Sequence, residues 1–221
     1  MIVDNFERIK KFIKLENQKR FVNSEDDDNQ FYLLQIIHRS KDGLTKFDEE
    51  GEKSHFSNKT IKSYYISSPE YLDKKKNEIM EMCHMFNARA YFNPNVKSYK
   101  QIALKSLAEL ARMVSNESYK GILSLVDSSC GQCGSAVKGQ NYWIVDIDTK
   151  DIDELNKIKS VIDKCEPIGE EKVVEIIPTL HGYHFISKPF NKKKFHDIYS
   201  EQIDIHDNNP TCLYYKEPDN Q

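Results

Sequence analysis

The second half of the chain alternates between apolar blocks with strand spacing and apolar blocks with helix spacing. A helix is predicted from Asp151 to the CEPIG segment, because Ile152, Leu155 and Ile158 recur at intervals that place them on one face. A further helix is predicted over residues 191–200. The predicted strands are YWIVDID (142–148), KVVEIIP (172–178), YHFIS (183–187) and material within QIDIHDNNPTCLYY (202–215). The elements therefore follow the order strand, helix, strand, strand, helix, strand.

The first half mixes the same two kinds of spacing. Helices are predicted over residues 6–21 and after Ser68 and Ser98, which stand where N-caps are expected. The predicted strands are FYLLQIIH (31–38), TIKSYYI (60–66) and ARAYF (88–92). We therefore expect one compact α+β protein with three parts. These parts are an N-terminal αβ unit (residues 1–115), a connecting loop segment (116–140) and a C-terminal unit (141–221) with ferredoxin-like element order.

Asp146 and Asp148 stand in the first strand of the C-terminal unit, where a buried strand rarely carries acids. Strand side chains alternate, so both acids point to the same face. In a ferredoxin-like sheet the third strand lies beside the first and the fourth lies on its other side, which brings His184 and Asp204 to the same region. If helices cover the apolar face, these groups converge on the open face.

Two carboxylates on one face repel each other unless a cation neutralises them. Mg²⁺ is commonly bound by one or two carboxylates together with substrate phosphates, as in nucleotidyl-transfer sites. The alternative is structural: Asp148 caps the following helix together with Thr149 and Asp151, and Asp146 is an exposed sheet residue. A polymerase palm is disfavoured, because such palms add acids at the turn between the second and third strands, and the turn here is PTLHG.

Three segments together resemble motifs of the archaeo-eukaryotic primase superfamily, which includes primase-polymerases. They are IVDIDTK, TLHGYHFISKPF and QIDIHDNNPTCLYY, in the family's order. The segment GYHFISKPF also resembles the corresponding segment of small phage-encoded members of this superfamily. The resemblance covers mainly residues 140–216.

The resemblance implies a primase-like fold and a role in DNA replication. It implies that Asp146, Asp148 and Asp204 are the catalytic metal ligands for Mg²⁺ or Mn²⁺. It also implies that His184 contacts the phosphates of a nucleoside triphosphate, and that single-stranded DNA or RNA is the template. Asp207 competes with Asp204 for the third position, and Asp204 is favoured because it directly follows Ile203.

Two further residues, Arg89 and Lys188, are candidates for the same site. Primases of this type build one wall of the nucleotide groove from their N-terminal unit, so Arg89 in the short strand ARAYF is a candidate phosphate or template contact. The alternative is a salt-bridged arginine beside a packed Tyr91. Lys188 follows the histidine strand and could reach a phosphate as a point charge. His181 is expected to be a surface turn residue.

The composition of the chain argues against some classes of protein and favours others. The 221 residues carry a formal net charge of −3, which argues against nonspecific binding of polyanions by the whole surface. We find no apolar run of about 18 residues, which a membrane span would need, and no signal peptide, so we expect a cytoplasmic protein without membrane contact. The five cysteines suit a reducing compartment. Cys130 and Cys133 form a C-x-x-C that is expected to be a flexible loop, with a zinc site as the alternative.

Three functions remain open on the sequence. The leading hypothesis is a primase-like nucleotidyltransferase. The second is a metal-dependent nuclease on the same fold, because two metals can position water as readily as a sugar hydroxyl. The third is a non-catalytic module that binds nucleic acid or protein, since RNA-recognition domains share the ferredoxin-like order.

Overall fold

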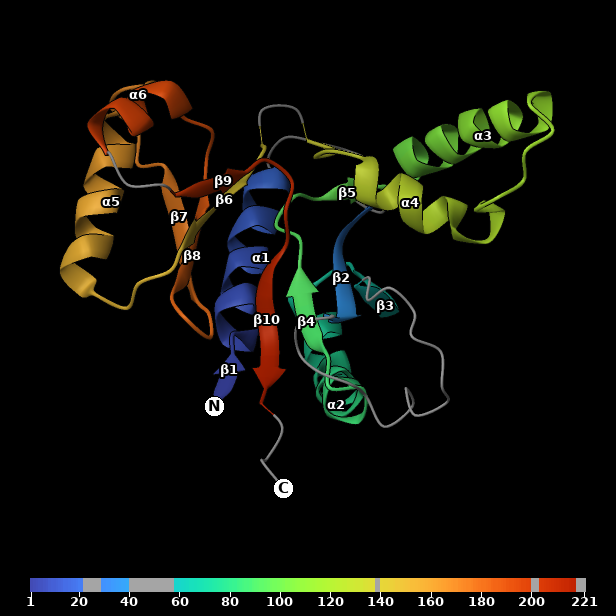
Figure 1. The fold of residues 1–221 in the computed structure, drawn as a ribbon, viewed down its shortest axis with the longest axis horizontal. Helices are drawn as coiled ribbons and strands as arrows, with labels where there is room; N and C mark the ends of the chain where they lie inside the picture. Colours follow the sequence, from blue (N-terminus) through green and yellow to red (C-terminus); the bar gives the residue numbers. More distant parts are fainter. Residues whose placement is uncertain (22–28, 40–57, 138–139, 200–202, 218–221) are drawn as a thin grey trace.

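The computed structural model describes residues 1–21, 29–39, 58–137, 140–199 and 203–217. Within these ranges the chain forms an α+β structure with two antiparallel sheets and six α-helices (Figure 1). The α+β class predicted from the sequence is therefore confirmed. No helix in the described ranges is long and apolar enough to cross a membrane.

The first sheet combines strands from both ends of the chain. Its order is β1 (Ile2–Asp4), β10 (Thr211–Lys216), β4 (Arg89–Phe92), β2 (Gln30–His38) and β3 (Lys59–Ile66), and β5 (Lys97–Ser98) pairs with the start of β2. Helices α1 (Phe6–Phe21) and α2 (Pro69–Met85) contribute to the core on one face of this sheet. In that core the ring of Phe92 lies 6.1 Å from the ring of Phe12 and 5.2 Å from that of Tyr32, measured between centroids.

The second sheet has the order β7 (Val173–Pro178), β8 (Tyr183–Ser187), β6 (Trp143–Ile147) and β9 (Asp204–His206). Helices α5 (Ile152–Lys164) and α6 (Lys192–Ile198) cover one face through a core that contains Val145, Ile158 and Phe195. The opposite face is not open along its whole length, because Ile144 and Ile186 pack into the core of the first sheet. The sheet therefore has partial cover on its aspartate-bearing face.

Strand β10 lies in the first sheet, although it follows the last strand of the second sheet after only a few residues. It pairs with β1 on one side and β4 on the other. Its residues from Thr211 to Tyr215 are all buried, as expected of a central strand that is covered on both faces. Residues 141–217 thus contribute strands to both sheets.

The segment that joins the two halves is helical over much of its described part. Helix α3 (Tyr99–Ser115) is followed by a 3₁₀ turn (Ile122–Ser124) and by α4 (Leu125–Gln132), and the two helices form a hairpin that projects from the body (Figure 1). Cys130 and Cys133 are not in a flexible loop. They are free thiols, buried with Phe31 and Ile102, because α4 packs against β2 and α3.

Candidate functional site

Asp146 faces away from the α5 core because β6 alternates. Val145 and Ile147 point into that core, while Ile144 and Asp146 point to the other face. Asp146 lies directly opposite His184 on β8 and opposite Asp204 on β9. The pairing of neighbours predicted from the sequence is therefore present, and residues directly opposite in an antiparallel pair share a face.

His184 connects β6 with β10 through both ring nitrogens. Its Nε2 lies 3.2 Å from Asp146 Oδ1, and its Nδ1 lies 3.0 Å from Oγ1 of the buried Thr211. When Nε2 carries the proton and donates it to Asp146, Nδ1 accepts the hydroxyl proton of Thr211. The hydrogen bond from His184 holds the pKa of Asp146 below its usual value, against the opposing effect of burial. Asp146 is therefore charged at neutral pH, and the imidazole ring is fixed between two strands.

The turn before β8 holds this strand close to the end of β6. The Thr179 hydroxyl oxygen accepts a hydrogen bond from the Gly182 amide at 3.1 Å, and the Thr179 amide donates to the Gly182 carbonyl at 2.9 Å. A Cβ on Gly182 would lie 1.9 Å from the carbonyl oxygen of Ile147. Only glycine fits here, because any side chain would collide with the backbone of Ile147. Ile147 is the last residue of β6 and is followed directly by Asp148.

Asp148 and Asp204 border a cavity of about 420 Å³ that we call the acidic cavity. Asp146 and Glu154 also line it, and the Tyr199 hydroxyl donates to Glu154 Oε1 at 2.8 Å. None of the described residues that line it is a lysine, arginine or histidine. This cavity is suited to a cation or a neutral hydroxyl rather than to an anion.

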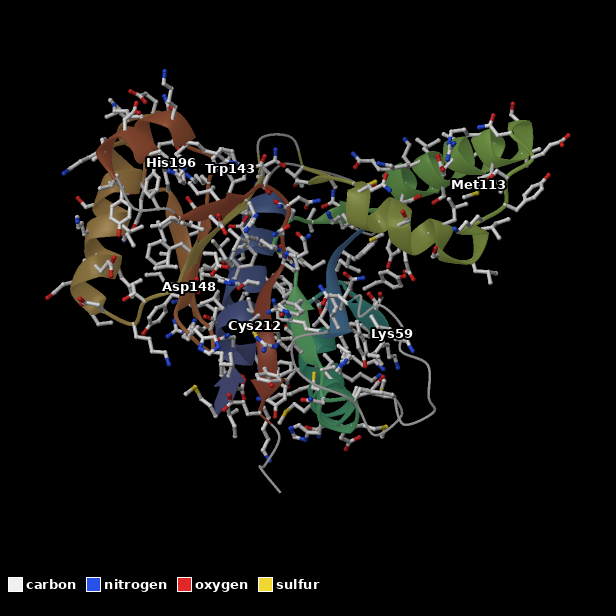
Figure 2. All side chains as sticks on the ribbon, viewed as in Figure 1. Lys59, Met113, Trp143, Asp148, His196 and Cys212 are labelled. Atoms are coloured by element: carbon white, nitrogen blue, oxygen red, sulfur yellow. The ribbon has the colours of Figure 1, made fainter. Side chains whose placement is uncertain are left out.

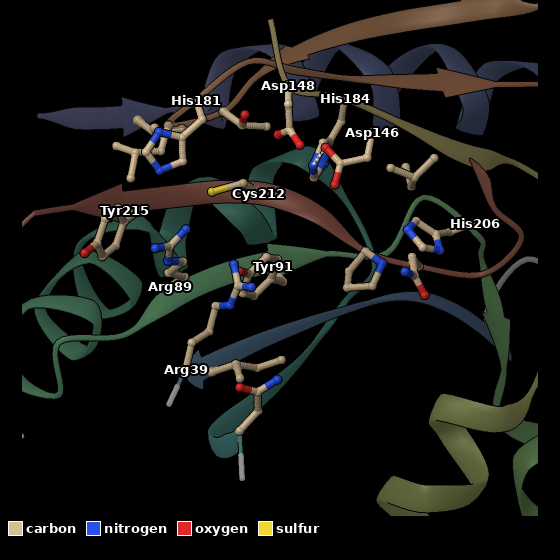
Figure 3. A pocket seen from close by; sticks show the side chains of 18 residues that line it. Arg39, Arg89, Tyr91, Asp146, Asp148, His181, His184, His206, Cys212 and Tyr215 are labelled. Atoms are coloured by element: carbon tan, nitrogen blue, oxygen red, sulfur yellow. Dashed lines mark hydrogen bonds and ion pairs between the residues drawn. The ribbon is translucent and has the colours of Figure 1, made fainter. Parts of the chain in front are cut away.

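A second cavity, of about 340 Å³, shares Asp146 and Asp148 and also contains two arginines; we call it the arginine cavity. Figure 3 shows Asp146 and Asp148 on one side of it and Arg39 and Arg89 on the other. Arg89 comes from β4, and its guanidinium carbon lies 4.3 Å from the centroid of the Tyr215 ring on β10. The cavity thus places acids and guanidinium groups opposite each other, between the two sheets.

Arg39 follows β2 and donates a hydrogen bond from Nη1 to the hydroxyl of Tyr91 at 3.4 Å. Among the arginine and histidine residues that line this cavity, Arg39 is one of two that the sequence did not single out. The sequence feature that could have pointed to Arg39 is a basic residue just after a predicted strand. The other is His206, which pairs with Ile144 across β6 and β9 and lines the same cavity. It stands two residues after Asp204 and therefore on the same face.

Lys188 is not brought to this site. It follows Ser187, which pairs with Trp143 at the far end of β6 from Asp148, and its Nζ lies 3.2 Å from Glu170 Oε2. It lines neither cavity. Asp207 is also separate, since it pairs with Nζ of Lys192 at 2.5 Å. His181 is exposed, as expected for a turn, but it borders the arginine cavity.

The described residues contain no group of three or more histidine, cysteine or acidic side chains arranged to hold a metal ion by themselves. Asp146 and Asp148 nevertheless offer two carboxylates at the boundary of both cavities. Carboxylate oxygen is the donor type that Mg²⁺ prefers, and Mg²⁺ usually completes its shell with water and substrate phosphates. Asp146 and Asp148 are therefore the described residues whose donor type suits such an ion.

Comparison with known proteins gives no independent assignment. No family model matches the chain, and neither a curated protein nor a solved structure does.

Proposed function

We propose that this chain is a metal-dependent, primase-like nucleotidyltransferase that uses nucleoside triphosphates and a nucleic-acid template. The observation that carries the proposal is the line of Asp204, Asp146 and His184 across three adjacent strands, of which Asp146 and His184 line the same cavity as Arg39 and Arg89. The order β7-β8-β6-β9, with all neighbours antiparallel, is also the order of a ferredoxin-like unit, which supports the finer fold assignment.

The two cavities support a division of roles. Arg39 and Arg89 supply fixed positive charge in the arginine cavity, where a triphosphate would replace water around the guanidinium groups. The acidic cavity has no basic lining residue among those described, so it suits the attacking 3′-hydroxyl end of a primer or a second nucleotide. Asp146 and Asp148 border both spaces and would lie where the two reactants meet.

Asp146 and Asp148 are the carboxylates that would hold the metal, with Asp204 on the acidic-cavity side. When bound, the metal would neutralise the triphosphate and lower the pKa of the attacking hydroxyl. His184 already uses Nε2 toward Asp146, so a phosphate oxygen would compete with that carboxylate for the same N–H. Thr211 would keep the ring oriented during this exchange through Nδ1.

The test follows labelled single-stranded DNA in Mg²⁺ or Mn²⁺, with and without nucleoside triphosphates. The wild type should lengthen primers or make new ones only with triphosphates, and Asp146→Ala/Asp148→Ala should lose this activity by at least about a hundredfold. Asp207→Ala is the matched control, because its carboxylate lies outside both cavities and should be dispensable.

Other outcomes separate the alternatives. Shortening of the DNA without triphosphates, lost in the double variant, would replace the proposal with a nuclease. Strong RNA binding in EDTA with no change of length in any condition would replace it with a binding module. Full activity in the double variant would refute the assignment of the carboxylates.

A further inference from the structure

Two histidines lie beside Asp146 on the same face of the second sheet, and they differ in how their rings are held. Both ring nitrogens of His184 are in use, one at 3.2 Å from Asp146 Oδ1 and the other at 3.0 Å from Thr211 Oγ1. The ring of His206 forms no hydrogen bond or salt bridge with any residue in the described part of the chain. One histidine is therefore fixed between two strands, whereas the other keeps its N–H group for a ligand.

The position of His206 in β9 brings its ring to the arginine cavity. It pairs with Ile144 of β6, two residues before Asp146, and so lies diagonally across from that carboxylate. Diagonal neighbours in a sheet are about 7–8 Å apart, a distance that long side chains can span. His206 is partly buried and lines the cavity together with Arg39 and Arg89 (Figure 3). The cavity thus brings three side chains with N–H donors to one space.

The electrostatics of Asp146 also locate His206 and Arg39 near this carboxylate. The pKa of Asp146 is lowered first by the hydrogen bond from His184, and the charge of Arg39 and that of a protonated His206 act in the same direction. Arg39 uses Nη1 toward the hydroxyl of Tyr91 at 3.4 Å. A guanidinium group has five N–H donors, so this single bond leaves others for an anion.

A phosphate oxygen would gain more from His206 than from His184. Nε2 of His184 can donate to a phosphate only by giving up the carboxylate of Asp146, and hydrogen bonds to ionised groups are about twice as strong as those between neutral groups. His206 has no such bond to lose. Either neutral tautomer of an imidazole carries one N–H group, so the donation needs no change of protonation. The balance of hydrogen bonds therefore favours His206.

We infer that His206, rather than His184, is the histidine that binds the phosphates of the substrate in the arginine cavity. Arg39 and Arg89 line the same space and share this role. The inference rests on the proposed function, which supplies a polyphosphate as the ligand. His184 keeps its bond to Asp146 and fixes the carboxylate beside the bound anion.

NMR of the histidine rings with inorganic tripolyphosphate tests the inference without turnover. Tripolyphosphate is titrated into the wild type at constant pH and constant Mg²⁺, and the ring nitrogens are followed in long-range ¹H–¹⁵N spectra assigned with His206→Ala and His184→Ala. The ring signals of His206 should shift to saturation, and those of His184 should move much less. Equal or larger shifts at His184, or no binding up to about 10 mM, would overturn the inference.

Calorimetric titration of the same ligand measures the contribution of each ring. His206→Ala should weaken binding by about tenfold, because one hydrogen bond to a charged group is lost, whereas His184→Ala should weaken it by less than about threefold. His196→Ala is the matched control. His196 is exposed on α6, lines neither cavity and lies away from Asp148 and Cys212 in Figure 2, so this variant should bind like the wild type. Equal losses in His206→Ala and His184→Ala would contradict the assignment.

Primer extension separates this inference from the proposed function. His206→Ala should raise KM for the nucleoside triphosphate by about tenfold and change kcat little. An active wild type and an unchanged KM in His206→Ala would overturn the inference and leave the proposed function standing. Tripolyphosphate binding through His206 in a wild type that extends no primer would refute the proposed function and leave the anion site standing.

Discussion

Gly182→Ala should destabilise the second sheet strongly, and the cause is a backbone contact that cannot yield easily. The new Cβ would lie 1.9 Å from Ile147 O, 2.9 Å from Ile147 C and 3.0 Å from Thr149 N. An ordinary contact needs about 3.5 Å, so the turn and the end of β6 must separate by about 1.6 Å. Overpacking of this kind costs about 1–3 kcal/mol, and each hydrogen bond lost at that end of the β6–β8 pair adds about 1 kcal/mol.

We therefore expect the free energy of unfolding to fall by about 2–4 kcal/mol in Gly182→Ala. Urea unfolding followed by tryptophan fluorescence is the assay, because Trp143 is the only tryptophan of the chain and lies on β6 itself. The midpoint should decrease by about 1–2 M urea.

Gly134→Ala is the matched control for this experiment. A Cβ at Gly134 meets no heavy atom within 4 Å, so the variant should unfold at the wild-type urea concentration or slightly above it. If Gly182→Ala unfolds at the same urea concentration as the control, the close approach of the turn to Ile147 is refuted.

Three further predictions concern titratable groups. Hydrogen bonds from two lysines lower the pKa of Glu78 to about 2, so the stability that Glu78 contributes is present above its unfolded pKa and is lost as the pH falls through the folded value. At neutral pH the unfolding free energy of Glu78→Gln should be about 1 kcal/mol below that of the wild type. This difference should disappear between about pH 4.5 and pH 2. His184→Ala should raise the pKa of Asp146 in carboxyl NMR titrations, whereas His181→Ala should leave it unchanged, and equal effects would contradict the direct hydrogen bond. Burial raises the pKa of Cys83 to about 12 and all five thiols are buried, so a thiol reagent at neutral pH should react rapidly only after unfolding, and fast labelling of the native protein would contradict this burial.

The local pattern of the sequence was sufficient to predict much of the second sheet. Alternation in β6 places Asp146 on a defined face, and the short PTLHG turn between β7 and β8 fixes their pairing. The contact with His184 then depends on the ferredoxin-like element order, which sets the third strand beside the first. Asp204 is preferred to Asp207 because it directly follows Ile203, and in the structure Asp204 lies opposite Asp146 while Asp207 pairs with Lys192.

Non-local features could not be predicted in this way. The return of β10 to the first sheet depends on pairing with strands more than a hundred residues earlier, and the apolar run CLYY is equally compatible with either sheet. Arg39 lines the arginine cavity together with Cys212 and Tyr215 of β10, although more than 170 residues separate them in the sequence. Lys188 failed as a candidate because sequence proximity to His184 does not reveal which end of β8 borders the site.

The path of the chain also dictates an order of assembly during synthesis. Residues 143–206 supply all four strands of the second sheet, which can pair as soon as this stretch has left the ribosome. Strand β1 pairs within the described structure only with β10, and one edge of β4 is likewise completed by β10. Strand β1, the first to be synthesised, must therefore wait for β10, the last described strand, before it can pair. Until then β4 keeps an unpaired edge. Strand β10 also carries Thr211, so the His184 ring gains its second hydrogen-bond partner only when β10 joins the structure.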